Sequence, residues 1–245
     1  MTPRRWAIVG GGRLGTALAT ALADVERVEG PFGRGFRGEG FDVVVLAVPD
    51  REIANAAAAI PVDAGRIVGH CSGATGLDVL APHECFGLHP LMTVPGTAAI
   101  AAGAASALFD GVPAALGGSS ARALSVAHEL AHRLGMEPFL IADRDRAAYH
   151  AAASMASNFL VTVEDAAEVL LRSAGLDRRI LLPLVRATLE NWGNDGRPAL
   201  TGPVSRGDQV TVDRQRRAVA ERAPELLNVF DALVERTRVI AADAP

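Results

Sequence analysis

The sequence of 245 residues contains no lysine, and all 24 of its basic residues are arginine. This absence excludes Schiff-base chemistry and general-acid catalysis by lysine, because both need a lysine amine. Acidic residues number 28, which gives the chain a net charge of −4. A chain without a basic excess is not expected to bind nucleic acid.

Cysteines, aromatic residues and long apolar runs are also scarce. Cys71 and Cys85 fit no CxxC or metal-ligand spacing, so we expect two reduced thiols and no metal site. Aromatic residues make up 4% of a chain that is 49% hydrophobic, a composition that suits helices and buried strands. No run of eighteen apolar residues occurs, and MTPRRWAIVG lacks the apolar core of a signal peptide. We therefore expect a cytoplasmic protein without a membrane partner.

A glycine-rich turn follows the first β-branched run, WAIVG at residues 6–10. Gly10, Gly12 and Gly15 form a GxGxxG pattern where this strand would turn into a helix. The first glycine permits the tight turn, the second lets the backbone approach a pyrophosphate, and the third packs the helix on the strand. The N-terminus of the helix would offer free N–H groups to the phosphates. The pattern predicts a dinucleotide site.

Apolar runs alternate with helical segments up to residue 143. Further strands are expected at 42–50, 64–73, 84–90, 112–118 and 136–142, with a helix at 120–135. This alternation predicts an α/β fold, with a Rossmann-type doubly wound parallel sheet in a dinucleotide-binding domain of residues 1–143.

From residue 144 the pattern is helical. Residues 144–175 fit one helix of about 30 residues, ended by Gly175. A helix at 176–193 would be kinked or broken at Pro183, and residues 211–242 would supply one or two more. We expect an all-helical domain over 144–245 that binds substrate and forms a dimer.

The end of the second strand, near residues 25–34, indicates which nicotinamide cofactor would bind. An acidic residue there would bind the ribose of NAD, whereas Arg34, followed by Arg37, favours the 2′-phosphate of NADP. Arg34 as a solvated loop charge and Glu29 as an NAD-binding acid both stay open. The residues predicted to bind the cofactor are Gly10, Gly12, Arg13, Leu14, Gly15, Arg34, Val48, Pro49 and Ser72.

Polar residues form a stripe on the otherwise apolar helix at 144–175. His150, Ser154 and Asn158 follow one another at intervals of four, so they share one helix face. A buried polar stripe needs hydrogen-bond partners, and both a cleft lining and polar packing between helices would provide them. A second group of donors stands in the turn-rich segment 198–213, where a plain surface loop is the alternative.

The segment GLHPLMT at 87–93 places His89 where a strand would end at the ligand-binding edge of a parallel sheet. A histidine titrates near neutrality and can donate a proton to a carbonyl or imine. The alternative is a buried histidine bonded to neighbouring backbone.

Six segments together carry a family resemblance, and they are GGGRLG, LAVPD, HCSGATGLDVL, FGLHPLMT, YHAAASMASNFLVT and LTGPVSRGD. They resemble a bacterial family of Rossmann-like proteins with a helical C-terminal domain of unassigned function, and the resemblance covers nearly the whole chain. More distantly, the layout is similar to pyrroline-5-carboxylate reductase, ketopantoate reductase, prephenate dehydrogenase and the β-hydroxyacid dehydrogenases.

The resemblance implies a C-terminal domain like that of 6-phosphogluconate dehydrogenase, with substrate held between it and the nicotinamide, and dimerisation through the helices. Prephenate dehydrogenases carry His-Pro-Met on the corresponding strand, which His89, Pro90 and Leu91-Met92 match loosely. β-Hydroxyacid dehydrogenases and ketopantoate reductases use a lysine, so their mechanism does not carry over to this chain.

We therefore expect an NADP-dependent oxidoreductase that reduces a small polar carbonyl or imine, for example a 2-oxo acid, and forms a homodimer. His89 would act as the acid, while Ser154 and Asn158 would position the carbonyl. The residues expected to bind substrate are His150, Thr201, Arg206 (as a carboxylate clamp) and Asp208. A dinucleotide-responsive binding protein without catalysis, a dimeric scaffold with a vestigial Rossmann domain, and a deazaflavin in place of nicotinamide stay open.

Overall fold

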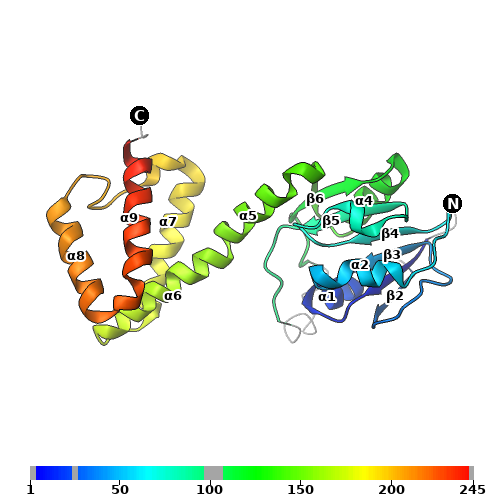
Figure 1. The fold of residues 1–245 in the computed structure, drawn as a ribbon, viewed down its shortest axis with the longest axis horizontal. Coiled ribbons are helices and arrows are strands. Elements are labelled where there is room, and N and C mark those ends of the chain that lie inside the picture. The colour runs from blue at the N-terminus through cyan, green and yellow to red at the C-terminus, as the bar shows by residue number, and fades with distance from the viewer. Residues whose placement is uncertain (1–3, 24–26, 97–106, 243–245) are drawn as a thin grey trace. The chain divides into compact units, whose positions relative to one another are not determined.

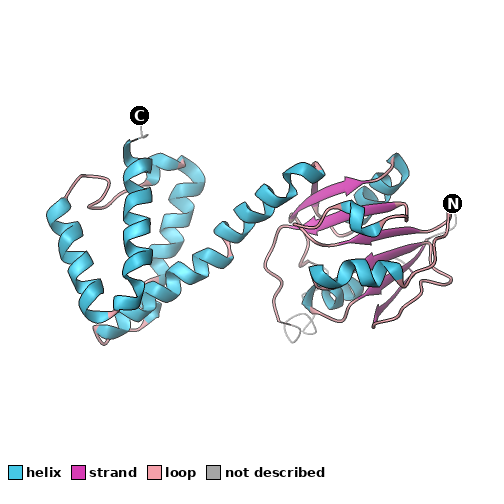
Figure 2. Cartoon of the chain, viewed as in Figure 1, coloured by secondary structure: helices cyan, strands magenta, loops and turns pink. Residues whose placement is uncertain are grey.

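The computed structural model describes residues 4–23, 27–96 and 107–242 of the chain. These residues belong to two compact units, Met1–Ser157 and Asn158–Pro245 (Figure 1). The first unit is an α/β structure and the second is helical (Figure 2).

The described part of the first unit is built on a seven-stranded sheet in the order β2-β1-β3-β4-β5-β6-β7. Its strands are β1 (Arg5–Val9), β2 (Arg27–Phe32), β3 (Val43–Leu46), β4 (Ile67–His70), β5 (Cys85–Pro90), β6 (Pro113–Gly118) and β7 (Glu137–Leu140). The predicted Rossmann-type α/β class is confirmed, and every predicted strand overlaps an observed one. The fully parallel arrangement is wrong at one pairing, because β6 runs antiparallel to β5. The remaining pairings are parallel.

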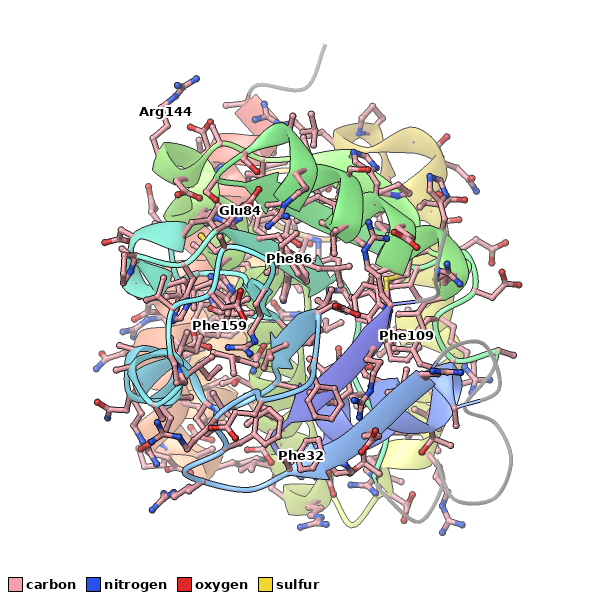
Figure 3. All side chains as sticks on the ribbon, turned by 90° about the vertical axis from the view of Figure 1, so that its right-hand side faces the viewer. Phe32, Glu84, Phe86, Phe109, Arg144 and Phe159 are labelled. Atoms are coloured by element: carbon pink, nitrogen blue, oxygen red, sulfur yellow. The ribbon has the colours of Figure 1, made fainter. Side chains whose placement is uncertain are left out.

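Helices cover both faces of the sheet, as the doubly wound class requires. Helices α1 (Arg13–Leu22) and α4 (Ala121–Arg133) pack on one face, in a cluster that includes Phe86 and Phe109, both labelled in Figure 3. Helix α2 (Asp50–Ala58) and the 3₁₀ turn η1 (Leu77–Leu80) pack on the other. Every residue of β3 is buried, which explains its continuous apolar run.

The chain leaves the sheet through the short 3₁₀ turn η3 (Asp143–Asp145) and helix α5 (Arg146–Ala156). The prediction of one helix over 144–175 is wrong, since Ser157 has φ −121° and ψ −75° and α6 (Asn158–Ser173) begins after it. Arg146 at the start of α5 is buried in the sheet unit. The compact units therefore divide after Ser157, whereas the change of sequence pattern falls at residue 143.

The described residues of the second unit are helical, as predicted. After α6 come α7 (Leu182–Asp195), α8 (Gln209–Arg222) and α9 (Leu227–Ala242), with 3₁₀ turns at Arg178–Ile180 (η4), Arg197–Ala199 (η5) and Pro224–Leu226 (η6). Gly175 follows α6 with φ +76°, a conformation that glycine adopts readily at a helix end. Pro183 lies in the first turn of α7, where its missing N–H costs no helical hydrogen bond. It marks the start of a helix instead of a kink.

The second unit buries little of its apolar surface. Among its described residues, the buried hydrophobic ones are Val212, Val219 and Ala223. Large exposed apolar side chains lie on α6, α7 and α9, and they include Phe159, Val161, Leu184, Leu189, Trp192, Val229, Leu233 and Val239. In the described parts of the chain, no helix is both long enough and apolar enough to cross a membrane.

Candidate functional site

The turn between β1 and α1 needs glycine at two of the three motif positions. Gly10 has φ +114°, and a Cβ there would overlap the carbonyl oxygen of Ala47. A Cβ on Gly15 would overlap the carbonyl oxygen of Gly10. Gly12, the N-cap of α1, differs: no described atom lies within 4 Å of its Cβ position. The open side of this turn lies at the N-terminus of a helix, where backbone N–H groups attract anions.

A cavity of about 360 Å³ opens where β1, β2 and β3 end. Its lining includes four residues predicted to bind the cofactor, Gly10, Arg34, Val48 and Pro49. Phe32 and Phe36, whose rings stack 4.2 Å apart, form an apolar wall (Phe32 is labelled in Figure 3). The lining also includes Arg51 in the first turn of α2, a residue not predicted from the sequence.

The charged groups near this cavity distinguish Arg34 as an NADP-binding residue from Glu29 as an NAD-binding acid. Arg34 is exposed and has no ion-pair partner among the described residues. Arg37 instead pairs with Glu39 at 3.6 Å. Glu29 lies inside β2, three residues before its end, and pairs with Arg5 at 2.9 Å. Of these side chains, Arg34 is the one in the cavity lining.

The remaining predicted cofactor residues lie nearby in different surroundings. Arg13, Leu14 and Gly15 form the first turn of α1. Ser72 is buried, and its hydroxyl donates to Asp50 Oδ2 (2.8 Å) and accepts from the backbone N–H of Thr75 (2.9 Å). These bonds hold the loop after β4 against the start of α2. A direct contact between Ser72 and a cofactor stays a prediction.

His89 at the end of β5 meets two side chains of α5. Its Nδ1 lies 2.7 Å from the hydroxyl of Tyr149, and its ring centroid lies 6.1 Å from that of His150. Gly73, in the loop after β4, packs so closely that a Cβ there would lie 2.9 Å from both imidazole rings. The structure therefore brings together β5, α5 and this loop.

The prediction that His89 titrates near neutrality is wrong. Burial lowers the pKa of His89 to about 4, and the neighbouring His150 and Arg146 act in the same direction. Burial also raises the pKa of Tyr149. At neutral pH a neutral imidazole and a protonated phenol thus share the hydrogen bond.

His70, one strand away, is a second neutral histidine on the same face of the sheet. It is fully buried; its Nδ1 accepts from the N–H of Ser72, and its Nε2 donates to the carbonyl oxygen of Gly76, each at 3.2 Å. Burial lowers the pKa of His70. His70, Tyr149 and Arg146 were not predicted from the sequence as parts of this region.

The polar stripe is divided between the two compact units. His150 and Ser154 lie one turn apart on α5, in the first unit. Asn158 begins α6 in the second unit, after the interruption at Ser157. The distance from Asn158 to His89 stays a prediction.

The loop before α8 belongs to the second unit. Asp208 is the N-cap of α8, and its carboxylate accepts from the N–H (3.1 Å) and the hydroxyl (2.7 Å) of Thr211. These bonds lower the pKa of the Asp208 carboxyl, and they are the bonds expected of a residue that caps a helix. Thr201 and Arg206 are exposed. Their roles in substrate binding, like that of Asp208, stay predictions.

The fold and the site define a class of protein with a Rossmann-like sheet unit and a helical C-terminal unit. Residues 38–95 match the model of a Rossmann-like domain, and residues 112–237 match a domain of unknown function, DUF2520. The second match covers just over half of the chain. The chain therefore belongs to the DUF2520 family, which confirms the resemblance seen in the sequence. No curated protein matches the sequence.

Solved structures share the fold over almost the full chain. A Bacteroides fragilis protein, BF3122, which carries the provisional name NADP oxidoreductase, has a TM-score of 0.78 at 19% identity, over 97% of this chain and 98% of that one. A reductive aminase from Aspergillus terreus, solved with NADPH and ethyl-5-oxohexanoate, has 0.71 at 15%, over 98% of each chain. A Plasmodium falciparum pyrroline carboxylate reductase with NADP bound has 0.55 at 11%, over 98% and 99%. At these identities the likeness establishes the fold.

Proposed function

We propose that the protein is an NADP-dependent oxidoreductase of the cytoplasm that reduces a small polar carbonyl or imine. The observation that carries the proposal is Arg34, an arginine without a described ion-pair partner in the lining of the cavity where β2 ends. A guanidinium in that position suits the 2′-phosphate that distinguishes NADP from NAD. The competing acid, Glu29, is engaged with Arg5 and lies before the strand end.

The residues at the glycine turn fit a dinucleotide. The open side of Gly12 leaves room for a pyrophosphate against the first N–H groups of α1. The cavity beyond the turn suits an adenosine, with apolar walls for the base and Arg34 for the phosphate. The reductive aminase and the pyrroline carboxylate reductase that share the fold were solved with NADPH and NADP, which supports the same cofactor here.

The cofactor, when bound, supplies the hydride that reaches the substrate carbon, and the chain supplies the proton. Tyr149 donates its hydroxyl proton to the carbonyl oxygen or imine nitrogen. His89, with its proton on Nδ1, reprotonates the phenolic oxygen across the 2.7 Å hydrogen bond while its Nε2 takes up a proton from solvent. This assignment changes the role of His89 from sole acid to the partner of Tyr149.

The other predicted site residues keep their proposed roles. Ser154 and Asn158 position the carbonyl group, and Arg206 holds a substrate carboxylate. His150, Thr201 and Asp208 complete the substrate contacts.

We also propose a homodimer formed through the helical unit. Three buried hydrophobic residues among the described part of that unit are too few to stabilise it, and large apolar side chains on α6, α7 and α9 remain exposed. A second copy of the same surface would cover them. Sedimentation of the purified protein at micromolar concentration should give a dimer, and a monomer would contradict this part of the proposal.

The direct test of the function is a turnover assay with the purified protein. NADPH and NADH are each offered with a panel of 2-oxo acids and cyclic imines, and loss of the reduced-nicotinamide absorbance is followed. NADPH should bind more tightly and support turnover of at least one compound. NADPH binding without turnover of any compound would favour a dinucleotide-responsive binding protein, and failure to bind NADPH would refute the proposal.

A further inference from the structure

Two glycines that face each other across β5 and β6 leave a gap on the α2 face of the sheet. Gly87 and Gly117 are direct partners in the antiparallel ladder. A Cβ on the first would lie 2.8 Å from Nη2 of Arg146, and a Cβ on the second 2.7 Å from the same atom. The guanidinium of Arg146 therefore fills the space that two side chains would otherwise occupy.

This guanidinium is almost without partners. The side chain of Arg146 is 1% exposed, and its Nε donates to Asp143 Oδ1 at 2.7 Å. Its Nη1 and Nη2 are buried without a hydrogen-bond partner in the described structure. Burial of a charge is costly, and an apolar side chain of similar volume often serves packing as well or better. Packing alone therefore does not explain an arginine here.

The guanidinium of Arg146 lies on the same face of the sheet as His70 and His89. His70 pairs with Gly87 in the β4–β5 ladder, so its side chain stands beside the guanidinium in one row across the sheet. His89 lies two residues along β5 from Gly87, on the same face. On α5, Tyr149 follows Arg146 by three residues, which places it on the same side of the helix.

We propose that Arg146 is a positioning residue of the site, whose buried charge repels a proton from His89 and whose anchorage on the sheet holds Tyr149 against that imidazole. The groups that act on His89 from the surrounding elements are His150, Arg146 and His70, which oppose its protonation, and Asp50, which favours it. The catalytic meaning of this role rests on the proposed function, but the electrostatic role does not.

The test is an NMR titration of the histidine ring protons in the full-length protein, with His89 identified through a His89→Gln variant. Arg146→Met fills the gap without charge, and Arg146→Gln keeps a donor toward Asp143 without charge. Arg146→Lys keeps the charge. Arg144→Met makes the same charge change two residues earlier, where the side chain is 85% exposed and projects outward (Figure 3).

The titration midpoint of His89 should rise in Arg146→Met and Arg146→Gln by about half a pH unit or more. It should stay at the wild-type value in Arg146→Lys and in Arg144→Met. An unchanged midpoint in a folded neutral variant would overturn the proposal. If neither neutral variant folds while Arg146→Lys does, the charge serves folding and the proposal also fails. The titration needs neither cofactor nor substrate, so a failure of the proposed oxidoreductase activity would leave its result unaffected.

Discussion

The hydroxyl of Tyr149 on α5 lies 2.7 Å from Nδ1 of His89 at the end of β5, and the two rings meet edge to face. If this pair delivers the proton, Tyr149→Phe should lower kcat by about 100-fold or more, the range typical of a lost general acid. The affinity for NADPH should not change. Steady-state kinetics on a substrate found in the turnover assay, with NADPH binding measured separately, would check both statements.

Phe139→Leu is the control for the tyrosine variant. The ring of Phe139 packs 5.9 Å from that of Tyr149, so this substitution changes its packing and removes no hydroxyl. Full turnover by Tyr149→Phe would show that the proton comes from another group.

Arg34→Ala should weaken NADPH binding by about 10- to 100-fold, the effect expected from loss of a charge-assisted phosphate contact. Binding of NADH, which has no 2′-phosphate, should stay the same. Arg37→Ala makes an identical charge change at an arginine that pairs with Glu39 and is outside the cavity lining among the described residues. Calorimetric titration of both variants with both cofactors decides the matter: an unchanged NADPH/NADH ratio in Arg34→Ala would refute the assignment.

Gly12→Val should abolish binding of either cofactor while leaving the fold intact. The space at the Cβ position of Gly12 is free of described atoms within 4 Å, and its φ of −73° suits any residue. Gly15→Ala provides the contrast, since its Cβ would overlap backbone and should destabilise the protein by about 3 kcal/mol. Thermal unfolding and cofactor titration separate the two effects. Cofactor binding by a folded Gly12→Val protein would place the phosphates elsewhere.

The stability of the protein should fall between pH 6.5 and pH 4, in part because of His89. The pKa of His89 is lowered from 6.5 to about 4 in the folded protein. The unfolded chain therefore binds this proton first as pH falls, and the free energy of unfolding decreases. Protonation of His89 lowers the free energy of unfolding by no more than about 3 kcal/mol, and this stability is regained as the pH rises above 6.5.

Urea unfolding at pH 7 and pH 4.5 tests this dependence. His89→Gln should show a smaller loss of stability than the wild-type protein over that interval. His132→Gln, at an exposed position on α4, should lose as much as the wild type. Equal losses in all three proteins would show that His89 does not titrate at a lowered pH.

The sequence predicted the elements of the sheet but not the direction of β6. An apolar run such as residues 112–118 fits a strand in either direction, because burial depends on side chains and not on chain polarity. The break at Ser157 was equally hidden, since no glycine or proline marks it. By contrast, the glycines at 10 and 15 predicted the turn correctly, because backbone contact leaves no room for a Cβ.

The site residues that were not predicted left only weak features in the sequence. Tyr149 is the single tyrosine of the chain and directly precedes the predicted stripe residue His150. Gly87 interrupts the apolar strand β5, and Gly117 begins the Gly-Gly pair that ends β6. Glycine within a strand indicates a close approach by another group. The identity of that group depends on the strand register, which pairs residues 30 positions apart and cannot be read from local pattern.

The reversed direction of β6 makes the length of the connection between β7 and α5 a determinant of the site. Since β7 runs parallel to β6, the chain leaves the sheet at the edge opposite the glycine turn, and α5 passes back over the same face. Three residues of a helix rise about 4.5 Å and two residues of a strand advance about 6.6 Å, so the helix and strand positions are spaced on a similar scale. Arg146 thus meets Gly87 while Tyr149 meets His89. One residue inserted or deleted between β7 and α5 would turn the helix by about 100° and carry both side chains away from the sheet, so this connection tolerates changes of residue more readily than changes of length.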